Sequence, residues 1–357
     1  MLLTPRRSMR PASLAATCAL ILLAMLMCLA PLGCAGAGAA DRGVESIDRN
    51  HAATDLEHWK PLAEQGDPDA QYLIGLMYTE GDGVPQDDAE AARWYRRAAD
   101  QDSARAQHAL AVLYEEGRGV DQSDELAAQW YRRAAEQAYA PAENNLGLMY
   151  LEGRGVPVDL AEARDWIRRA AVQGVASAQF TLGWMHLNGR GVPQDAGEAL
   201  TWISLAANQG LPAAQSMLGL MHLRGQGVKP DPSLAAEWLK KAAERGVPAA
   251  QANLALLYVR GQGIEKDLEQ AAHWFTQAAE RGVVMAQTRL AAMHEHGRGV
   301  PQNDLAAYVW YGIAAFEGDA TAAAHWDLVA ARLPADDLER GDELIARWTA
   351  RRLNEPR

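Results

Sequence analysis

The stretch Gly153-Arg154-Gly155-Val156-Pro157-Val158-Asp159, followed by Ala163, Trp166 and the pair Ala170-Ala171, decides the fold of this chain. The same pattern recurs seven times at a spacing of 36 residues, without insertion or deletion. Its first glycine is Gly81, Gly117, Gly153, Gly189, Gly225, Gly261 and Gly297. A fixed period of this length indicates a repeat array, in which each copy is a small structural unit stacked on the next.

The residues before each glycine pair form the first helix of a copy, here named helix A. In the third copy this segment covers residues 142–150, and its apolar residues recur three and four apart, which predicts a helix with one buried stripe. One position in the stripe is always small, although glycine inside a helix costs about 1 kcal/mol relative to alanine. We therefore expect another helix to cross close to this position, which holds Gly75, Ala111, Gly147, Gly183, Gly219, Ala255 and Ala291.

A Gly-x-Gly loop then leads into the second helix of the copy, named helix B. The first glycine is expected to end helix A in the left-handed conformation. An Asp, Ser or Asn at a fixed register is expected to cap helix B, and Glu90, Glu162, Glu198 and Gln270 predict a capping box in four copies. Each tryptophan of helix B is interpreted as a packing residue between its own helix A and the next. A phosphate-binding loop is rejected, because no Lys-Ser or Lys-Thr follows the glycines.

Residues 1–40 have the layout of a secretory signal peptide. Arg6, Arg7 and Arg10 precede an apolar run at 14–30, and small residues follow, so cleavage is expected near residues 37–40. Two alternatives stay open: a retained anchor helix, and a lipoprotein signal in which Cys34 is lipidated. We expect an exported protein of the periplasm or cell envelope, attached to a membrane only through such a leader or lipid.

Composition limits the function of the remaining chain. All three cysteines lie in the leader, so the body is expected to contain no disulfide, no thiolate metal site and no cysteine nucleophile. The whole chain has a formal net charge of −12, and loss of the three leader arginines makes it more acidic. An acidic exported protein is a poor candidate for binding nucleic acid.

The remaining chain divides into three parts. Residues 41–54 are polar and lack periodicity, which favours a short tether. Residues 55–333 hold the seven full copies, with a half-copy at each end. Residues 334–357 are expected to form a capping helix with Leu338, Ile345 and Trp348 on one side, because the end of a repeat array needs a polar outer face.

The assembled motifs are Ala-Gln and Leu-Gly-x-Met-Tyr in helix A, Gly-x-Gly-Val-x-x-Asp in the loop, and Ala-x-x-Trp and Ala-Ala in helix B. Together, over about residues 56–333, they resemble the Sel1-like repeat, a relative of the tetratricopeptide repeat. The resemblance implies an all-α fold, a right-handed α-solenoid superhelix of antiparallel helix pairs. It also implies a scaffold or adaptor in protein–protein interaction, here with a body expected to be monomeric.

The variable side of helix A is the candidate site for a protein or peptide partner, since helix A lines the concave face in solenoids of this type. In the fourth copy this ridge is wholly apolar, and packing of Trp184 against a neighbouring helix is the alternative interpretation. Asparagines at one register of the ridge could bind a peptide backbone or a C-terminal carboxylate. The candidate residues are Phe180, Trp184, Leu187, Asn144, Asn145, Leu148, Leu151, Ser216, Met217, Leu220 and Asn253.

Catalysis is not expected. His186, His222 and His294 replace the tyrosines of other copies, and equivalent residues of stacked copies are too far apart to share a metal ion. Some exported members of the family are described as penicillin-binding or β-lactamase-like, which supplies an alternative function. However, the Ser-x-x-Lys motif is absent from the sequence, and the repeats lack cysteines. We therefore expect no metal, no cofactor and no enzyme activity.

Overall fold

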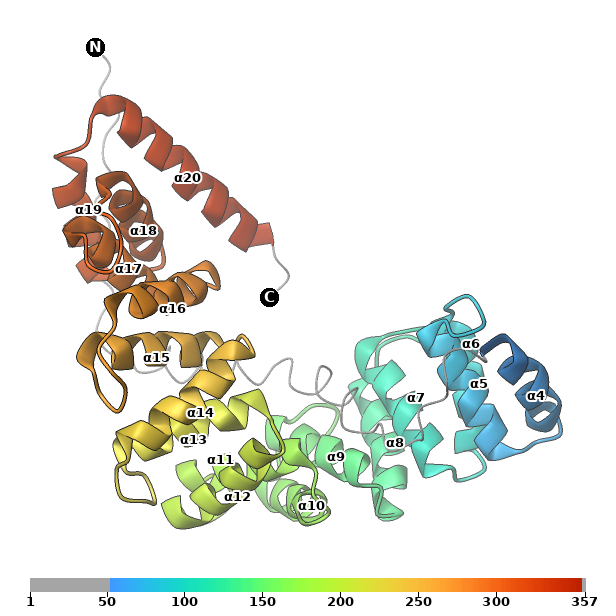
Figure 1. Ribbon diagram of the computed structural model, residues 1–357. Helices are drawn as coiled ribbons and strands as arrows, with labels where there is room; N and C mark the ends of the chain where they lie inside the picture. The colour runs from blue at the N-terminus through green and yellow to red at the C-terminus, as the bar shows by residue number, and fades with distance from the viewer. Residues whose placement is uncertain (1–51, 355–357) are drawn as a thin grey trace. The chain divides into compact units, whose positions relative to one another are not determined.

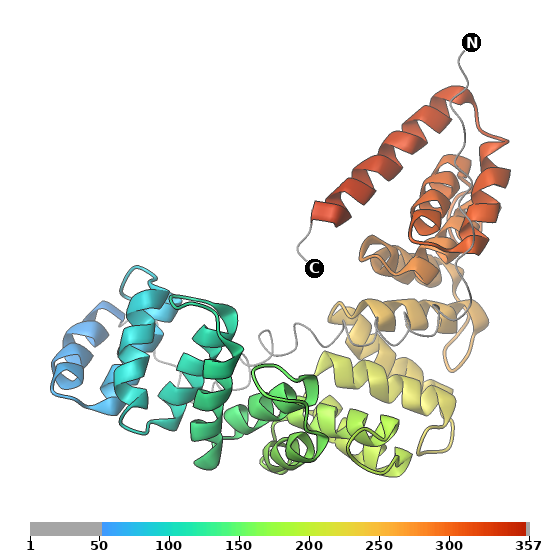
Figure 2. The same ribbon diagram turned by 180° about the vertical axis from the view of Figure 1, so that it is seen from behind.

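The computed structural model describes residues 52–354, and these residues form helices α4–α20 and no strand (Figures 1 and 2). The predicted leader, with Cys34, and the predicted tether up to residue 51 lie outside the described residues. The last three residues of the predicted tether are helical, because α4 begins at Ala52.

Helices of type A and type B alternate along the chain, as the repeat pattern predicts. The A helices are α5 (Pro68–Glu80), α7 (Ala104–Glu116), α9 (Ala140–Glu152), α11 (Ala176–Asn188), α13 (Pro212–Arg224), α15 (Pro248–Arg260), α17 (Val284–His296) and α19 (Ala320–Ala330). The B helices are α4 (Ala52–Glu64), α6 (Asp88–Ala99), α8 (Asp124–Glu136), α10 (Leu160–Val172), α12 (Ala196–Asn208), α14 (Pro232–Glu244), α16 (Leu268–Glu280) and α18 (Asp304–Phe316). The capping helix is α20 (Ala335–Asn354).

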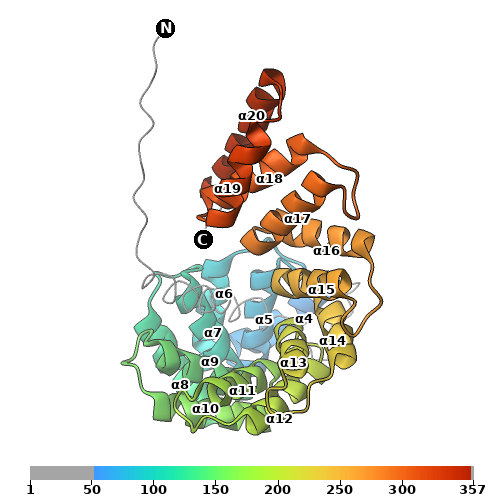
Figure 3. The same ribbon diagram turned by 90° about the vertical axis from the view of Figure 1, so that its left-hand side faces the viewer.

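The chain forms two compact units, divided between Ser177 and Ala178. The first contains α4–α10 and the second contains nearly all of α11 and then α12–α20. Within the second unit, α11, α13 and α15 lie on one side, and α12 and α14 lie on the other (Figure 3). Below, positions in a copy are counted from the first residue of its helix A, so that Pro212 is position 1 and Arg224 is position 13.

The loop between the two helices confirms the predicted caps. Gly153 ends α9 with φ 76°, and its amide donates to the Met149 carbonyl. Asp159 then caps α10, because its side chain accepts from the amides of Ala161 and Glu162. The predicted capping box is wrong: the Asp159 amide already donates to the Tyr150 carbonyl of helix A, so no donor remains for the carboxylate of position 23.

The close helix crossing is confirmed at the small position of helix A. A Cβ atom on Gly147 would lie 2.6 Å from Ile167 Cγ1 and 3.2 Å from the Ala163 carbonyl oxygen, both on α10. Gly183 and Gly219 face their own helix B in the same way. Helix A and helix B of one copy therefore touch along their backbones, and the glycine is required by that approach.

The second glycine of the loop joins one copy to the copy before it. Gly155 has φ 63°, and a Cβ atom there would lie 2.7 Å from the Glu125 amide nitrogen and closer still to the Asp124 carbonyl, in the first turn of α8. Gly119, Gly227, Gly263 and Gly299 meet the preceding helix B in the same way. This backbone contact leaves no room for a side chain.

The helix B tryptophans pack against their own helix A, as predicted, but they are mostly half-buried. Arg96 lies 5.2 Å from the Trp130 ring centre, so this tryptophan also reaches the helix B of the preceding copy, which the sequence did not indicate. A basic residue three positions on covers the other face of the ring in several copies. Arg97 lies 4.5 Å from the Trp94 ring centre, and Lys241 lies 4.0 Å from that of Trp238.

A buried glutamine at position 4 forms a polar link between copies that sequence reasoning missed. Gln107 Nε2 donates to the Ala99 carbonyl of the preceding helix B at 3.1 Å, and its Oε1 accepts from Gln137 at 2.8 Å. Gln71 has the same two kinds of contact. The side chain therefore adds a second hydrogen bond to a carbonyl at the end of one helix, which also accepts from the turn that follows, and fixes the next helix to it.

We name the glutamines at position 4 the glutamine ladder. Glu143, at position 4 of the third copy, is the exception to it. Its carboxylate accepts from Gln173 Nε2 at 2.6 Å, but a carboxylate cannot donate to the carbonyl at the end of α8. Burial raises the pKa of Glu143, while Arg169 and the bond from Gln173 partly offset this effect. A raised pKa in the folded state means that ionisation of Glu143 lowers stability as the pH rises through that pKa.

Replacing Gly155 with alanine is expected to lower the free energy of unfolding by about 3 kcal/mol, since backbone overlap adds to the left-handed strain. Gly297→Ala is the matched control, because Gly297 has the same left-handed backbone (φ 62°) and its Cβ would come no closer than 3.4 Å, to Gln302 Cβ. It should cost about 1 kcal/mol. Urea unfolding followed by circular dichroism measures the free energy of unfolding of both variants. Equal losses would contradict the conclusion that the backbone contact at Gly155 holds neighbouring copies together.

Glu143→Gln is expected to stabilise the fold by about 1 kcal/mol at pH 7, because the amide can complete the ladder without a buried charge. The gain should shrink at pH 4, where Glu143 of the parent protein is protonated to a larger extent. Urea midpoints of both proteins at the two pH values test this expectation. A destabilised variant, or a gain that does not depend on pH, would show that the carboxylate is not the cause.

Candidate functional site

One line of side chains on helix A remains accessible after the copies stack. In α13 it consists of Ala213, Met217 and Leu220, which are half-buried, and Arg224, which is exposed. These are positions 2, 6, 9 and 13, and their spacing of four, three and four places them on one face of the helix. We name this line the helix A stripe. The same line in α15 consists of Ala249, Asn253, Leu256 and Arg260.

The predicted ridge has a different register from the helix A stripe, because it follows positions 5, 9 and 12. At position 5, Asn144, Phe180 and Ser216 are only 5%, 7% and 7% exposed, so neighbouring helices cover them. At position 12, Leu151 is 2% exposed and Leu187 is half-buried. Six predicted residues therefore remain accessible: Trp184, Leu148 and Leu220 at position 9, Met217 and Asn253 at position 6, and Leu187 at position 12.

The asparagines singled out in the sequence are engaged within the chain. Asn144 Nδ2 donates to Asn145 Oδ1 at 3.2 Å, and Asn145 Nδ2 lies 3.3 Å from His108 Nε2. Asn253 Nδ2 donates to the Ala249 carbonyl of its own helix at 2.7 Å. Asn145 is buried, so Asn253 is the more accessible of the two.

The three predicted packing histidines occupy the register of the tyrosines. Tyr114 and Tyr150 receive hydrogen bonds from Arg96 and Arg132 of the preceding helix B. In the copies preceding His222 and His294, the arginine position holds Ser204 and Thr276 instead. Burial lowers the pKa of His294, and a hydrogen bond with the backbone of Pro301 partly offsets this, so the neutral ring is favoured. Residues 52–354 contain no group of three His, Cys, Asp or Glu side chains that could hold a metal ion.

Two carboxylates at equivalent positions, of which Glu115 is half-buried and Glu295 buried, accept a hydrogen bond at each oxygen. Glu115 accepts from Tyr131 at 2.7 Å and from Arg154 at 2.5 Å. Glu295, in the equivalent position of α17, accepts from Tyr311 and Arg332, both at 2.9 Å. Burial opposes the charge of Glu295, but the bonds from Arg332 and Tyr311 outweigh burial and lower its pKa. Such carboxylates stabilise the stack, and they are poorly placed to accept a proton from a substrate.

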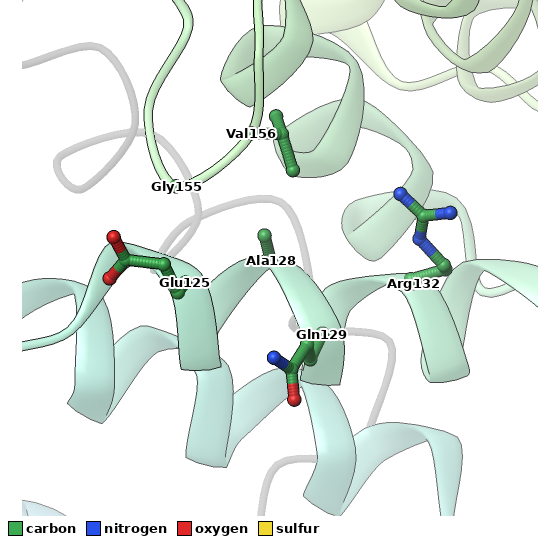
Figure 4. A pocket seen from close by; sticks show the side chains of 6 residues that line it. All are labelled: Glu125, Ala128, Gln129, Arg132, Gly155 and Val156. Carbon is green, nitrogen blue, oxygen red and sulfur yellow. The ribbon is translucent and has the colours of Figure 1, made fainter.

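A shallow pocket of about 260 Å³ lies where α8 meets the loop of the following copy. Figure 4 shows the loop residues Gly155 and Val156 facing Glu125, Ala128, Gln129 and Arg132 of α8. The guanidinium of Arg132 is already bonded to Tyr150. The pocket therefore results from the backbone contact between Gly155 and α8, which we name the glycine joint. The side chains that line it form no nucleophile–base pair. Separately, none of the described helices is long and apolar enough to cross a lipid bilayer.

The repeat geometry matches one known family. The Sel1 repeat matches seven consecutive segments, residues 68–103, 104–139, 140–175, 176–211, 212–247, 248–283 and 284–319. The chain belongs to the Sel1 repeat family. Proteins with Sel1 repeats are generally scaffolds for protein interaction. The predicted family and the all-α solenoid are confirmed.

Solved structures of Sel1 repeat proteins resemble this one. A Sel1 repeat protein from Oxalobacter formigenes is 32% identical, with 68% of this chain and 96% of that chain covered and a TM-score of 0.61. The protective antigen c5321 of uropathogenic Escherichia coli, which has the same type of repeat, is 25% identical. There, 82% of this chain and 86% of that chain are covered, and the TM-score is 0.48. No curated protein sequence matches this Sel1 repeat chain.

Proposed function

We propose that this Sel1 repeat protein is a non-catalytic scaffold, and that the helix A stripe of its second unit binds a protein or peptide partner. The single observation that carries the proposal is the row of apolar side chains at position 9. Leu220 and Leu256 pack at the edge of the core, yet both keep part of their surface accessible. Half-buried apolar side chains in a row, already fixed by their neighbours, can bind a partner at a low cost in side-chain entropy.

The composition of the stripe supports this choice over the surface of helix B. Trp94, Trp130, Trp166 and Trp238 of helix B are each covered by a basic side chain three positions on, so their exposed faces already have a partner. Along the stripe, in contrast, position 6 changes from Met217 to Asn253 between adjacent copies, whereas the buried position 7 is leucine in both. The buried position 5 varies as well, so it is the combination of variation with accessibility that favours the stripe for recognition.

The proposal that the protein is not an enzyme rests on the saturated side chains. Glu115 and Glu295 are bonded to tyrosine and arginine, and the loop glycines contact backbone instead of a ligand. General acid–base catalysis needs a group that can reach a substrate proton within hydrogen-bond distance. No observation favours the β-lactamase-like alternative over a scaffold.

We further propose that the scaffold works in the cell envelope, because residues 1–40 have the layout of an export signal. Fractionation of cells that produce the full chain is expected to recover the protein in the periplasmic or membrane fraction. Cys34→Ala distinguishes the two modes of attachment, since only a lipidated protein would leave the membrane fraction upon this change. Recovery of the parent protein in the cytoplasm would contradict the proposal.

Leu220→Gln is expected to reduce capture of the partner from an envelope extract at least tenfold, because a polar amide replaces the apolar contact at the centre of the stripe. Leu205→Gln is the matched control, since Leu205 is 44% exposed on helix B of the same unit. Quantitative mass spectrometry of the captured proteins measures the effect, and circular dichroism checks that both variants stay folded. Equal capture by the two folded variants would contradict binding at the stripe.

A further inference from the structure

The helix A stripe carries a charge pattern that differs between the two units. In the second unit, position 13 holds Arg224 in α13 and Arg260 in α15, directly after the apolar residues Leu220 and Leu256 on the same face. In the first unit, the same position holds Glu80, Glu116 and Glu152, after Leu76, Val112 and Leu148. Position 9 is thus apolar in the named helices of both units. The charge at position 13, which we name the edge of the stripe, is positive in the second unit and negative in the first.

The two arginines are available for a partner. Both are exposed, and neither has an ion-pair partner among residues 52–354. In the first unit, by comparison, Glu116 and Glu152 are paired with Arg118 at 3.1 Å and Arg154 at 2.7 Å. The edge of the first unit is therefore largely neutralised within the chain, whereas the edge of the second unit is not.

The positive edge rests on the two arginines themselves. The loops that follow them contain Lys229 and Lys266 but also Glu265 and the helix B caps Asp231 and Asp267, so they add no net positive charge. The two exposed arginines stand out in a chain whose formal net charge is −12. A cation in the last turn of a helix also interacts favourably with the helix dipole, so the charge alone would not mark a site. The charge marks a site because it lies next to the accessible apolar side chains of Leu220 and Leu256.

We propose that the stripe of the second unit binds an acidic, amphipathic peptide segment of a partner protein. Apolar side chains of the segment would pack on Leu220 and Leu256, and its carboxylates would pair with Arg224 and Arg260 at the edge. Guanidinium groups suit this task, because they bind carboxylates with two parallel hydrogen bonds. This inference rests on the proposed scaffold function and specifies the chemistry of the partner.

The geometry also predicts how specificity arises. A basic segment would be repelled by Arg224 and Arg260. An acidic segment placed on the stripe of the first unit would meet Glu80, and among the described residues the cation of that stripe, Arg105, is already paired with Asp69 at 3.1 Å. The edge charge therefore selects both the sign of the partner and the unit to which it binds, while the apolar row supplies contact area common to both.

The test uses the purified protein, in the form that accumulates in the cell, and a random library of 12-residue peptides displayed on phage. Peptides selected by the parent protein are expected to combine apolar residues with Asp and Glu. Affinity of the synthesised peptides is then measured by fluorescence anisotropy. The double variant Arg224→Glu, Arg260→Glu should bind them at least tenfold more weakly, and 0.5 M NaCl should weaken binding to the parent protein.

The control for the same change in charge is Arg340→Glu, Arg351→Glu, since both residues are exposed and lie on α20, which packs on α18. It should bind within about twofold of the parent protein, because the altered charges lie on a helix outside the stripe and are screened by salt. Selected peptides that are neutral or basic, or equal losses in both double variants, would overturn the acidic partner and leave the scaffold function standing. Failure to select any peptide would contradict both.

Discussion

The contact between the second loop glycine and the preceding helix B is the constraint on which the stack depends. At Gly155, the loop of one copy lies directly on the first turn of α8, and any side chain would overlap the Asp124 carbonyl. Because backbone meets backbone, the distance between copies is set by van der Waals contact of backbone atoms and not by the size of side chains. A constant contact of this kind explains why seven copies keep a 36-residue period without insertion. An extra residue in the loop would move the next helix off this contact.

The local features of a copy could be predicted from the sequence, because each depends on a few neighbouring residues. The left-handed cap at Gly153, the N-cap at Asp159 and the close crossing at Gly147 all belong to this class. The capping box was wrong because the Asp159 amide already donates to the Tyr150 carbonyl. No pattern within helix B alone could indicate that bond.

The accessible face of helix A could not be predicted in the same way, because burial depends on the helices of two neighbouring copies. Phe180 looks like part of an apolar ridge in the sequence, yet adjacent helices cover it. A comparison of copies contains a signal that could have found part of the core. Glu115 and Glu295 occur where position 28 is tyrosine, and Leu151 occurs where it is Ile167. Such covariation identifies position 12 as a contact with helix B.

Packing and recognition therefore use different positions of the same helix. The glycine joint, the glutamine ladder and the Tyr–Glu–Arg groups hold the copies together, and they leave positions 2, 6, 9 and 13 free to vary. The charge at position 13 can consequently differ between units without cost to the fold. Repeat scaffolds gain new partners by this route, since each copy contributes its own side chains to a common line.

Photo-crosslinking in living cells tests the central claim, that partners bind at the helix A stripe, most directly. A benzophenone amino acid is placed at Met217 on the stripe, and in a second strain at Leu205 on helix B, both half-buried or exposed positions of one unit. The account predicts a covalent adduct with a discrete partner from Met217 and none from Leu205. An adduct from Leu205 alone would show that the binding surface lies on helix B and would contradict the account.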